Sequence, residues 1–341
     1  MKIILDAMGG DNAPGEIVKG AVLAASEYGI NTVLVGRENV ILEHLSKIPE
    51  YAKIKDKIEI QNADDIIEMG EDPFSIMRAK KESSAAVAMR LLKDGSGDAF
   101  VGAGSTGAMV IGASMIVRTI PKIRRGAIAT VLPFEKPLLL IDSGANVNVT
   151  PEYLEQFAAM GSVYMNKIFG IEKPRVGLLN NGAEECKGTE VLVETHKLLK
   201  GSDLNFVGNV EARDITFGVC DVLVCDGFSG NIVLKYSEGM AKFFSKKLKG
   251  LFLANVFTKI SALIVKKQIA ELKKSFDASE YGGAPILGIS KPVIKAHGSS
   301  DAQAIKNALR QAKAFVETGV IDDICEYTNK RYQKNEAVIN E

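Results

Sequence analysis

Short apolar runs alternate with segments of helical periodicity along most of the chain. The first run, Lys2–Asp6, predicts a buried strand, and Pro14–Tyr28 predicts a helix because Ile17, Ala21 and Ala24 repeat on one face. Further strands are predicted at Thr32–Val35, Lys57–Ile60, Asp98–Val101, Ala127–Leu132, Leu138–Asp142, Arg175–Leu179, Leu204–Val207, Asp221–Cys225 and Val293–Ala296. A helical pattern follows the strand Thr32–Val35 and continues to Lys47. Further helices are predicted at Pro151–Phe169, Thr189–Leu199 and Asp301–Thr318. This alternation indicates an α/β fold whose largely parallel sheet is covered by helices on both faces.

The segment Met240–Ser275 departs from the alternation. It carries nine lysines and one acidic residue, Glu271, so its formal charge is +8, and its apolar residues recur at helical spacing. We therefore expect two basic amphipathic helices, inserted as a hairpin over residues 239–275. The α/β unit is expected over residues 1–238 and 276–330, as one body or as two lobes around a cleft. Residues 331–341 are expected to form a polar C-terminal tail.

Composition narrows the classes of function. The 341 residues have a formal net charge of zero, so any attraction to nucleic acid or to a membrane has to come from a local patch. Tryptophan is absent and aromatic residues are few, which argues against nucleic-acid binding through stacked bases. The four cysteines and three histidines show no metal-ligand spacing, so we expect no metal site. We find no signal peptide and no apolar stretch of the ~18 residues that a membrane span needs, and expect a cytoplasmic protein.

Glycine occurs with Asp, Asn, Ser or Thr directly after six of the predicted strands. In parallel α/β sheets ligands bind beyond the carboxyl ends of the strands. Glycine lets backbone N–H groups approach an anion, and the helix that follows contributes its positive end. One such turn is more often a capped loop than a site, but six together favour a shared anion-binding cleft. The six segments are Asp6–Asn12, Gly102–Gly107, Asp142–Asn146, Asn180–Gly188, Asp226–Asn231 and His297–Asp301.

One of these segments matches a dinucleotide fingerprint. Gly102-x-Gly104-x-x-Gly107 follows a predicted strand and opens a helix, which makes a nicotinamide-dependent dehydrogenase an alternative. The acidic residue expected about 20 positions later, to hold the ribose, is missing. That region holds Arg124 and Arg125 instead, and the next acid is Glu135.

His297 and Lys187 are the most informative ionisable residues in the six segments. His297 lies at a predicted strand end among small polar residues, where a catalytic role and a capping role are both open. Lys187 precedes a predicted helix and is either a solvated charge or an anion clamp. His44 and His196 lie within helical patterns, where surface or packing roles are expected.

Several strings together resemble the PlsX family, the phosphate acyltransferases of bacterial phospholipid synthesis. They are DAMGGDNAP, DSGANVN, DGFSGN followed by SEG, and EYGGAPILG leading to IKAHGSSDAQAIKNA, in the family's order from Lys2 to about Ala312. Two positions depart from the family's pattern: Ser105 stands where asparagine is usual, and Ala212 where glycine is usual.

The resemblance implies a three-layer α/β/α fold like that of isopropylmalate dehydrogenase, related to the phosphotransacetylases, in a homodimer. It implies transfer of a fatty acyl group from acyl carrier protein to inorganic phosphate, without a metal or an organic cofactor. The acyl phosphate would feed a membrane glycerol-3-phosphate acyltransferase. A non-catalytic scaffold that binds acyl carrier protein remains a further alternative.

With this reaction in view, the polar turns receive candidate roles. Lys187, Asn231 and His297 are the expected catalytic residues, with Asn231 as the donor to the oxyanion. The rival route is a covalent acyl-cysteine at Cys186 or Cys225. Phosphate and substrate are expected to contact Asp6, Gly9, Gly10, Asn12, Gly104, Ser105, Thr106, Gly107, Asp142, Asn146, Asp226, Ser299 and Ser300.

Two surfaces are expected to meet other partners. Acyl carrier protein is acidic and would dock on a basic cluster formed by Arg118, Lys122, Arg124 and Arg125, unless this cluster is merely a solvated turn. The basic helical segment suits an anionic membrane surface or a dimer contact, which would place the protein peripherally on the inner face of the cell membrane. The expected membrane-contacting residues are Leu251, Phe252, Val256, Phe257 and Ile260.

Overall fold

A mixed sheet of eleven strands runs through the molecule in the order β3-β2-β1-β4-β11-β10-β5-β6-β9-β7-β8. The computed structural model describes residues 1–134, 136–269 and 281–339. The strands are β1 Lys2–Asp6, β2 Asn31–Gly36, β3 Ile58–Asn62, β4 Ala99–Gly102, β5 Ala127–Pro133, β6 Pro137–Ile141, β7 Val176–Asn180, β8 Phe206–Glu211, β9 Val222–Val224, β10 Ala284–Leu287 and β11 Val293–Lys295.

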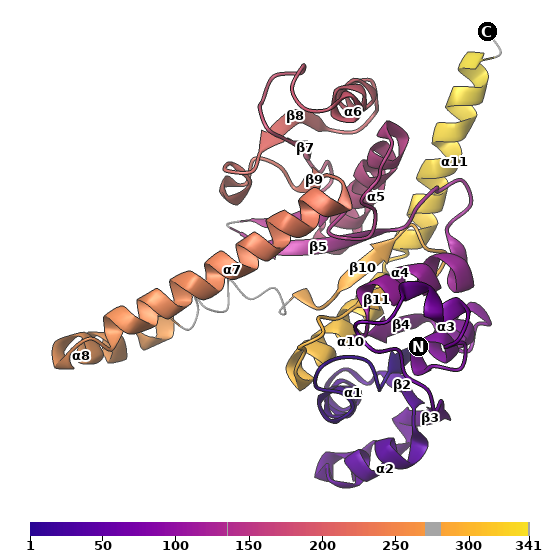
Figure 1. Ribbon diagram of the computed structural model, residues 1–341, viewed down its shortest axis with the longest axis vertical. Coiled ribbons are helices and arrows are strands. Elements are labelled where there is room, and N and C mark those ends of the chain that lie inside the picture. Colours follow the sequence, from indigo (N-terminus) through magenta and orange to yellow (C-terminus); the bar gives the residue numbers. More distant parts are fainter. Residues whose placement is uncertain (135, 270–280, 340–341) are drawn as a thin grey trace.

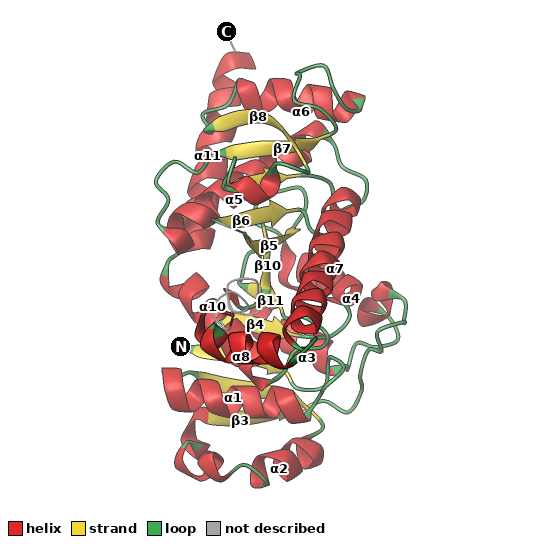
Figure 2. Ribbon diagram, turned by 90° about the vertical axis from the view of Figure 1, so that its left-hand side faces the viewer, coloured by secondary structure: helices red, strands yellow, loops and turns green. Residues whose placement is uncertain are grey.

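Helices cover both faces of this sheet, which gives three layers (Figures 1 and 2). The helices are α1 Gly15–Tyr28, α2 Glu38–Ser46, α3 Ser84–Lys93, α4 Thr106–Gly112, α5 Pro151–Phe169, α6 Glu190–Lys200, α7 Gly227–Phe252, α8 Val256–Ile264, α10 Ala302–Glu317 and α11 Val320–Ile339. Short helical turns are η1 Pro49–Lys53, η2 Lys55–Lys57, η3 Pro73–Met77, η4 Ala113–Arg118 and η5 Ile215–Phe217. The expected α/β/α fold is confirmed.

The hydrophobic core has four clusters, which correspond to two faces in each half of the sheet. In the half that contains β1–β4 and β11, one cluster packs under α1 and α10 and the other under α3 and α4. In the half that contains β5–β9, a cluster packs under α5 and α11, and a smaller one lies beneath the start of α7. Because both faces are buried, the strands read as continuous apolar runs, which is why they were visible in the sequence.

Local signals explain where several elements begin and end. β1 and α5 have the bounds that the sequence predicts. Pro151 opens α5 in the first turn, where its missing N–H has no intrahelical partner, and Gly170 ends the helix with a φ of +70°. Gly29 ends α1 in the same left-handed conformation, with a φ of +66°.

Most predicted strands agree with the structure to within one or two residues, and the largest differences occur at two strands. β10 was not predicted, because a four-residue strand between Gly283 and Gly288 gives no usable periodicity. It pairs antiparallel with both β11 and β5. β8 begins at Phe206 rather than Leu204 and continues to Glu211. It is an edge strand whose polar residues hide it from a hydropathy pattern.

The basic helical segment also begins elsewhere. α7 starts at Gly227, well before residue 239, because the side chain of Asp226 accepts the N–H groups of Phe228 and Ser229 and caps the helix there. α7 and α8 extend away from the body of the molecule, with α8 at the far tip (Figure 1). Residues 270–275 of the expected hairpin lie outside the described residues. The expected polar tail continues α11 as far as Ile339.

Candidate active site

The loops after β1 and β4 pack directly against each other. A Cβ atom on Gly9 would lie 2.9 Å from both the nitrogen and the Cα of Gly104, and 2.6 Å from Oδ2 of Asp6, so only glycine fits. Asp6 is buried, and burial raises the pKa of its carboxyl while hydrogen bonds from the Ser84 side chain and neighbouring N–H groups act against the rise. The Asp6 carboxylate therefore holds the β1 loop in shape.

The loop after β11 joins the same group. The N–H of Asp11 donates to the carbonyl of Gly298 at 2.8 Å. The side chain of Asn12 donates to the carbonyl oxygens of Ser299, at 3.1 Å, and Ser300, at 3.2 Å. Gly10 belongs to the same contact, because its Cβ position lies 3.1 Å from the Gly298 oxygen. Three of the six predicted turns thus meet at adjacent strand ends.

α4 begins directly after the β4 loop, two residues from the Gly104 that packs against Gly9. The first N–H groups of a helix have no partner within the helix, and the Ser105 side chain does not cap them. Thr106 is exposed while Ser105 and Gly104 are buried. Gly107 lies against Pro73, whose Cγ would be 2.6 Å from a Cβ at this position. Uncapped N–H groups together with the positive end of the helix dipole favour an anion here.

His297 has a defined tautomer in this setting. Its Nδ1 accepts the N–H of Ser299 at 3.2 Å and lies 2.9 Å from the Ser299 hydroxyl. Because Nδ1 is an acceptor, the neutral ring carries its proton on Nε2. Burial lowers the pKa of His297, and the nearby charge of Lys235 on α7 lowers it further. At neutral pH the ring is therefore a neutral donor through Nε2.

A second group forms where the β6 loop meets the start of α7. Oδ1 of Asp142 accepts the N–H groups of Gly144 and Ala145, at 3.0 and 2.9 Å, and Oδ2 accepts the N–H of Asn146 at 2.6 Å. The Asn146 side chain donates to the same oxygen at 2.8 Å. Asp142 is fully buried, and burial raises the pKa of its carboxyl. Its oxygens are occupied by this loop and by the N–H of Ile128 on β5.

The first turn of α7 lies directly on this loop. A Cβ at Gly230 would lie 1.9 Å from the carbonyl oxygen of Asp142, and one at Gly227 would lie 2.8 Å from the nitrogen of Asn146. Because the Asp226 side chain caps Phe228 and Ser229, and Gly227 donates to the Asn146 carbonyl, this helix start has few donors left for an anion. The N-termini of α4 and α7 therefore differ in their capacity to bind phosphate.

α7 connects the two groups. Near its start, Asn231 is exposed and its side-chain oxygen lies 3.9 Å from the Cβ position of Gly144 in the β6 loop. Further along the same helix, the positive charge of Lys235 lowers the pKa of His297, which follows β11. Lys235 is held by Glu238 at 2.9 Å. The helix thus brings both groups to one side of the molecule, although they follow strands of opposite direction.

Lys187 lies in the loop after β7, which is separated from β6 only by β9. Lys187 is exposed, its carbonyl accepts the Asn180 side chain at 3.0 Å, and its N–H donates to Glu184 at 3.1 Å. Among the described residues, the hydrogen bonds of Lys187 join it only to Asn180 and Glu184, at either side of its own loop. The structure therefore does not place Lys187 against the other predicted turns.

Several residues near these loops were missed by the sequence prediction. Lys295 ends β11 and is buried beside the β4 loop. The charge of Asp11 raises the pKa of Lys295, and the charge of Lys235 lowers it. Met69 contacts the β11 loop, because its Cε lies 3.4 Å from the Cβ position of Gly298. A lysine inside the apolar run Val293–Ala296 was the available signal for Lys295. Nothing in the local sequence links Met69 to the site.

The basic cluster Arg118, Lys122, Arg124 and Arg125 is exposed and begins where η4 ends. α4 and η4 form one helical segment, so at about 1.5 Å per residue roughly 18 Å separate its glycine-loop end from Arg118. The turn is held to α5 because the Arg124 N–H donates to Gln156 at 3.0 Å and Gln156 donates to the Lys122 carbonyl at 3.0 Å.

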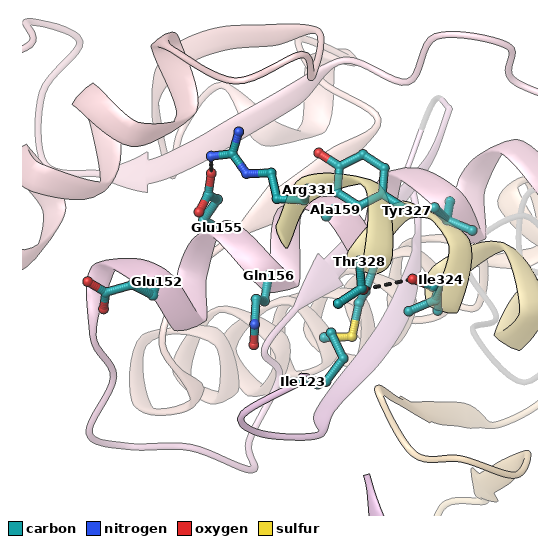
Figure 3. Close-up of a pocket in the computed structure, with 11 residues that line it drawn as sticks. Ile123, Glu152, Glu155, Gln156, Ala159, Ile324, Tyr327, Thr328 and Arg331 are labelled. Atoms are coloured by element: carbon teal, nitrogen blue, oxygen red, sulfur yellow. Dashed lines mark hydrogen bonds and ion pairs between the residues drawn. The ribbon is translucent and has the colours of Figure 1, made fainter. Parts of the chain in front are cut away.

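A pocket of about 150 Å³ lies between α5 and α11, next to this basic turn (Figure 3). Its walls are mainly apolar, and an ion pair between Arg331 and Glu155 crosses one end. Burial raises the pKa of Glu155 while Arg331 acts against the rise. The pocket shares no residue with the six polar turns, so it is separate from the site described above.

The predicted membrane-contacting residues lie at the tip formed by the end of α7 and by α8. Leu251, Val256, Phe257 and Ile260 are exposed, and Phe252 is half-buried. Phe257 is 82% exposed, so little of the described part of the chain covers it. Of the described helices, none combines the length and the apolar character that crossing a bilayer requires.

Comparison with known proteins identifies the family. The family model described as "Fatty acid synthesis protein" matches residues 1–323. The chain is 47% identical over 330 residues to the phosphate acyltransferase of Thermoanaerobacter pseudethanolicus, an alignment that covers 96% of this chain and 97% of that protein. The chain belongs to the PlsX family of phosphate acyltransferases. A second relative, the phosphate acyltransferase of Clostridioides difficile, is 42% identical, with 98% of each chain covered. The protein is therefore an acyltransferase that transfers an acyl group to phosphate.

Solved structures show the same fold at low sequence identity. A phosphotransacetylase from Streptococcus pyogenes is 19% identical with a TM-score of 0.60, and 93% of this chain and 94% of that chain are covered. A branched-chain phosphotransacylase from Enterococcus faecalis gives a TM-score of 0.58 at 16% identity, with 93% and 99% covered. The fold expected for a phosphate acyltransferase is confirmed.

Proposed function

We propose that the enzyme transfers a fatty acyl group from acyl carrier protein to inorganic phosphate, giving an acyl phosphate for phosphatidic acid synthesis. The observation that carries this proposal is the meeting of the β1, β4 and β11 loops at the uncapped start of α4. Backbone donors, the helix dipole and His297 there suit a phosphate group. Family membership supports the acyl transfer, and a fatty acyl donor on carrier protein fits a fatty acid synthesis family.

The proposed reaction is a direct attack of bound phosphate on the thioester. A phosphate oxygen forms a bond to the carbonyl carbon, a tetrahedral oxyanion follows, and the carbon–sulfur bond breaks to release the thiolate of the carrier protein. Holding phosphate in line removes much of the entropic barrier. We assign phosphate binding to the N–H groups around Gly9, Gly10 and Gly104–Gly107, with Asn12, Ser105, Thr106, Ser299 and Ser300 as the neighbouring residues of the site.

Asn231 and His297 are the proposed catalytic side chains. We assign Asn231 as the donor to the oxyanion, where one hydrogen bond typically contributes about 3 kcal/mol. His297 donates through Nε2 to phosphate or to the departing sulfur. Lys187 is proposed to approach the phosphate only when substrate is bound, since it lies exposed in its own loop. Asp6, Asp142 and Asp226 hold the loops that carry these groups, together with Asn146.

The acyl-cysteine alternative is weak at Cys225. This thiol is buried, burial raises its pKa well above the ordinary value, and its hydrogen bond goes to the Asp142 carbonyl. A thiol that resists ionisation is a poor nucleophile. Cys186 is exposed and is the cysteine that a test has to address.

Carrier protein is proposed to dock on Arg118, Lys122, Arg124 and Arg125. Exposed basic residues attract an acidic partner, and they lie one helix length from the phosphate loops, which the carrier's long prosthetic arm has to span.

We also propose a homodimer and peripheral attachment to the cytoplasmic face of the membrane. Exposed apolar residues follow one stripe of α7, namely Phe228, Ile232, Tyr236 and Phe243, which a second copy would cover. The basic tip with Leu251, Phe252, Val256, Phe257 and Ile260 then meets anionic lipid. Delivery to a membrane glycerol-3-phosphate acyltransferase follows from that placement.

The test measures release of carrier thiol from acylated carrier protein, with and without inorganic phosphate. Phosphate-dependent release with formation of acyl phosphate is expected, and a variant with all four cysteines changed to alanine should keep turnover within about twofold. Docking without release would indicate a scaffold instead. Binding of a nicotinamide dinucleotide in place of carrier protein would indicate a dehydrogenase.

A further inference from the structure

Lys295 is a buried cation directly behind the glycine loops. It ends β11, where it lies opposite Gly102 of the parallel strand β4, and it is 9% exposed. Its Nζ donates to the carbonyl of Ala103 at 3.3 Å and to the carbonyl of Ala296. Both acceptors come immediately before residues of the site, Gly104 and His297.

This ammonium group lacks a carboxylate partner at contact distance. Among the described residues, no acidic side chain lies within ion-pair distance of Nζ, and burial lowers the pKa of Lys295 to about 8. Asp11, in the β1 loop, raises this pKa, while Lys235 on α7 lowers it, and His297 lies on the same strand end. A buried charge without a close counter-ion is costly, and a bound anion in the adjacent loops would offset that cost.

The two carbonyl contacts also fix the direction of two N–H groups. In a trans peptide the N–H points away from the C=O. The carbonyls of Ala103 and Ala296 turn towards Lys295, so the N–H groups of Gly104 and His297 turn away from it. Gly104 belongs to the loop against which Gly9 packs, where the backbone donors for phosphate gather. One side chain therefore orients donors in two loops at once.

We propose that Lys295 is the positioning residue for substrate phosphate, holding the Ala103 and Ala296 carbonyls so that the following N–H groups face the anion, and adding its own positive charge behind them. The proposal rests on the proposed phosphate site. It assigns Lys295 to phosphate rather than to the acyl donor. A substitution of Lys295 should therefore change KM for phosphate and leave KM for the acyl donor nearly unchanged.

The pH dependence follows from the charge of Lys295. The ammonium form is present below its pKa and is lost as pH rises through about 8. Bound phosphate favours the charged form of Lys295. Above pH about 8, kcat at saturating phosphate should therefore stay constant, while kcat/KM for phosphate should fall. Asp11, Lys235 and His297 face the same region and set the exact midpoint of this fall.

The experiment compares wild type with Lys295→Met, Lys295→Arg and a control, Lys291→Met, in which the changed residue is an exposed lysine just before the same strand. Initial rates of thiol release from acylated carrier protein are measured against inorganic phosphate at pH values from 6.5 to 9.5. We expect Lys295→Met to raise KM for phosphate at least tenfold and to leave KM for acylated carrier protein within about twofold. Lys295→Arg should recover most of the affinity and move the alkaline fall to higher pH, and Lys291→Met should match wild type.

A second readout does not depend on turnover. Inorganic phosphate should raise the melting temperature of wild type and of Lys291→Met, and much less that of Lys295→Met. Equal stabilisation of all three by phosphate would overturn the role of Lys295. If wild type released no thiol yet phosphate stabilised it through Lys295, the reaction would be wrong and the phosphate role supported. If Lys295→Met does not fold, an alkaline fall in wild type that Lys295→Arg leaves unmoved would overturn the proposal.

Discussion

Asp142 shows, at the scale of single residues, how this protein uses buried carboxylates. Its two oxygens accept N–H groups from its own loop and from Ile128, so the carboxylate organises backbone rather than substrate. Asp6 does the same in the β1 loop through the N–H of Met8. A carboxylate that faced phosphate would repel it. The carboxylates of Asp6 and Asp142 therefore hold the backbone of their loops in shape.

Replacing Asp142 should destabilise the fold. Asp142→Ala would leave several buried N–H groups without acceptors, and each such group costs about 1–3 kcal/mol, so the free energy of unfolding should fall by about 3 kcal/mol or more. Urea unfolding of the purified variant measures this. Asp56→Ala, at an exposed carboxylate, is the control and should stay within about 0.5 kcal/mol of wild type. An equal effect of both substitutions would contradict the role given to Asp142.

His297 should be required in its neutral form. Because its pKa lies below the ordinary value of 6.5, the neutral ring persists to lower pH, and kcat/KM should fall only at a pH below that value. His297→Ala should lower kcat by roughly 10²-fold, and His297→Gln, which keeps a donor, by less. The pH profile of His297→Gln is the critical measurement, since phosphate itself also titrates. An acidic limb identical to that of wild type would show that His297 is not the titrating group.

At the scale of elements, α7 is the helix that links the two groups of polar turns. Its first turn lies on the β6 loop, and Lys235, about two turns further along, lowers the pKa of His297 after β11. This contact depends on Gly230, since no other residue leaves room for the Asp142 carbonyl. The place of the helix thus follows from a close backbone approach at Gly230, and Lys235 then adds its charge near His297.

Gly230 and Gly239, two of the four glycines of α7, provide a matched test. Gly230→Ala would place a Cβ 1.9 Å from the Asp142 oxygen and push the helix away, so turnover should fall more than about tenfold because the catalytic groups are misplaced. Gly239→Ala meets nothing within 4 Å and should raise stability by about 0.5–1 kcal/mol, since alanine favours helix. Rates of thiol release and thermal unfolding distinguish the two. A Gly230→Ala enzyme with normal turnover would contradict the role of this contact.

At the scale of the whole molecule, α7 and α8 expose many large apolar side chains to solvent. We expect such a surface to be covered by a partner or by lipid. The α7 stripe and the tip are separable, because Phe243 lies midway along α7 and Phe257 lies on α8. Burying one such side chain contributes about 1.5–3 kcal/mol, enough for a tenfold effect on binding.

Two charge substitutions should therefore separate the two surfaces. Phe243→Glu should shift the protein from dimer to monomer in sedimentation, because a charge would be buried at the contact. Phe257→Glu should keep the dimer but lose at least tenfold in flotation with anionic vesicles. Each variant is the control for the other. Unchanged vesicle binding by Phe257→Glu would remove the tip from the membrane model.

The sequence by itself determined the α/β class, most strands and helices, the six polar turns and the family. Buried strands and amphipathic helices impose periodicities that a single chain displays, and glycine at a strand end marks a backbone approach whatever its partner. β10 was not predicted because four residues are too few to show a periodicity. The start of α7 was not predicted because its capping residue, Asp226, lies inside a predicted turn.

Only the tertiary structure decided which turns meet and which of their side chains are buried. It brought the β1, β4 and β11 loops together, left Lys187 in its own loop, and turned Asp6 and Asp142 inward to the backbone. It also placed Lys295, an ordinary lysine in the sequence, behind the site. These outcomes depend on strand order and on contacts between residues far apart in the chain, and strand order leaves no periodicity in the sequence.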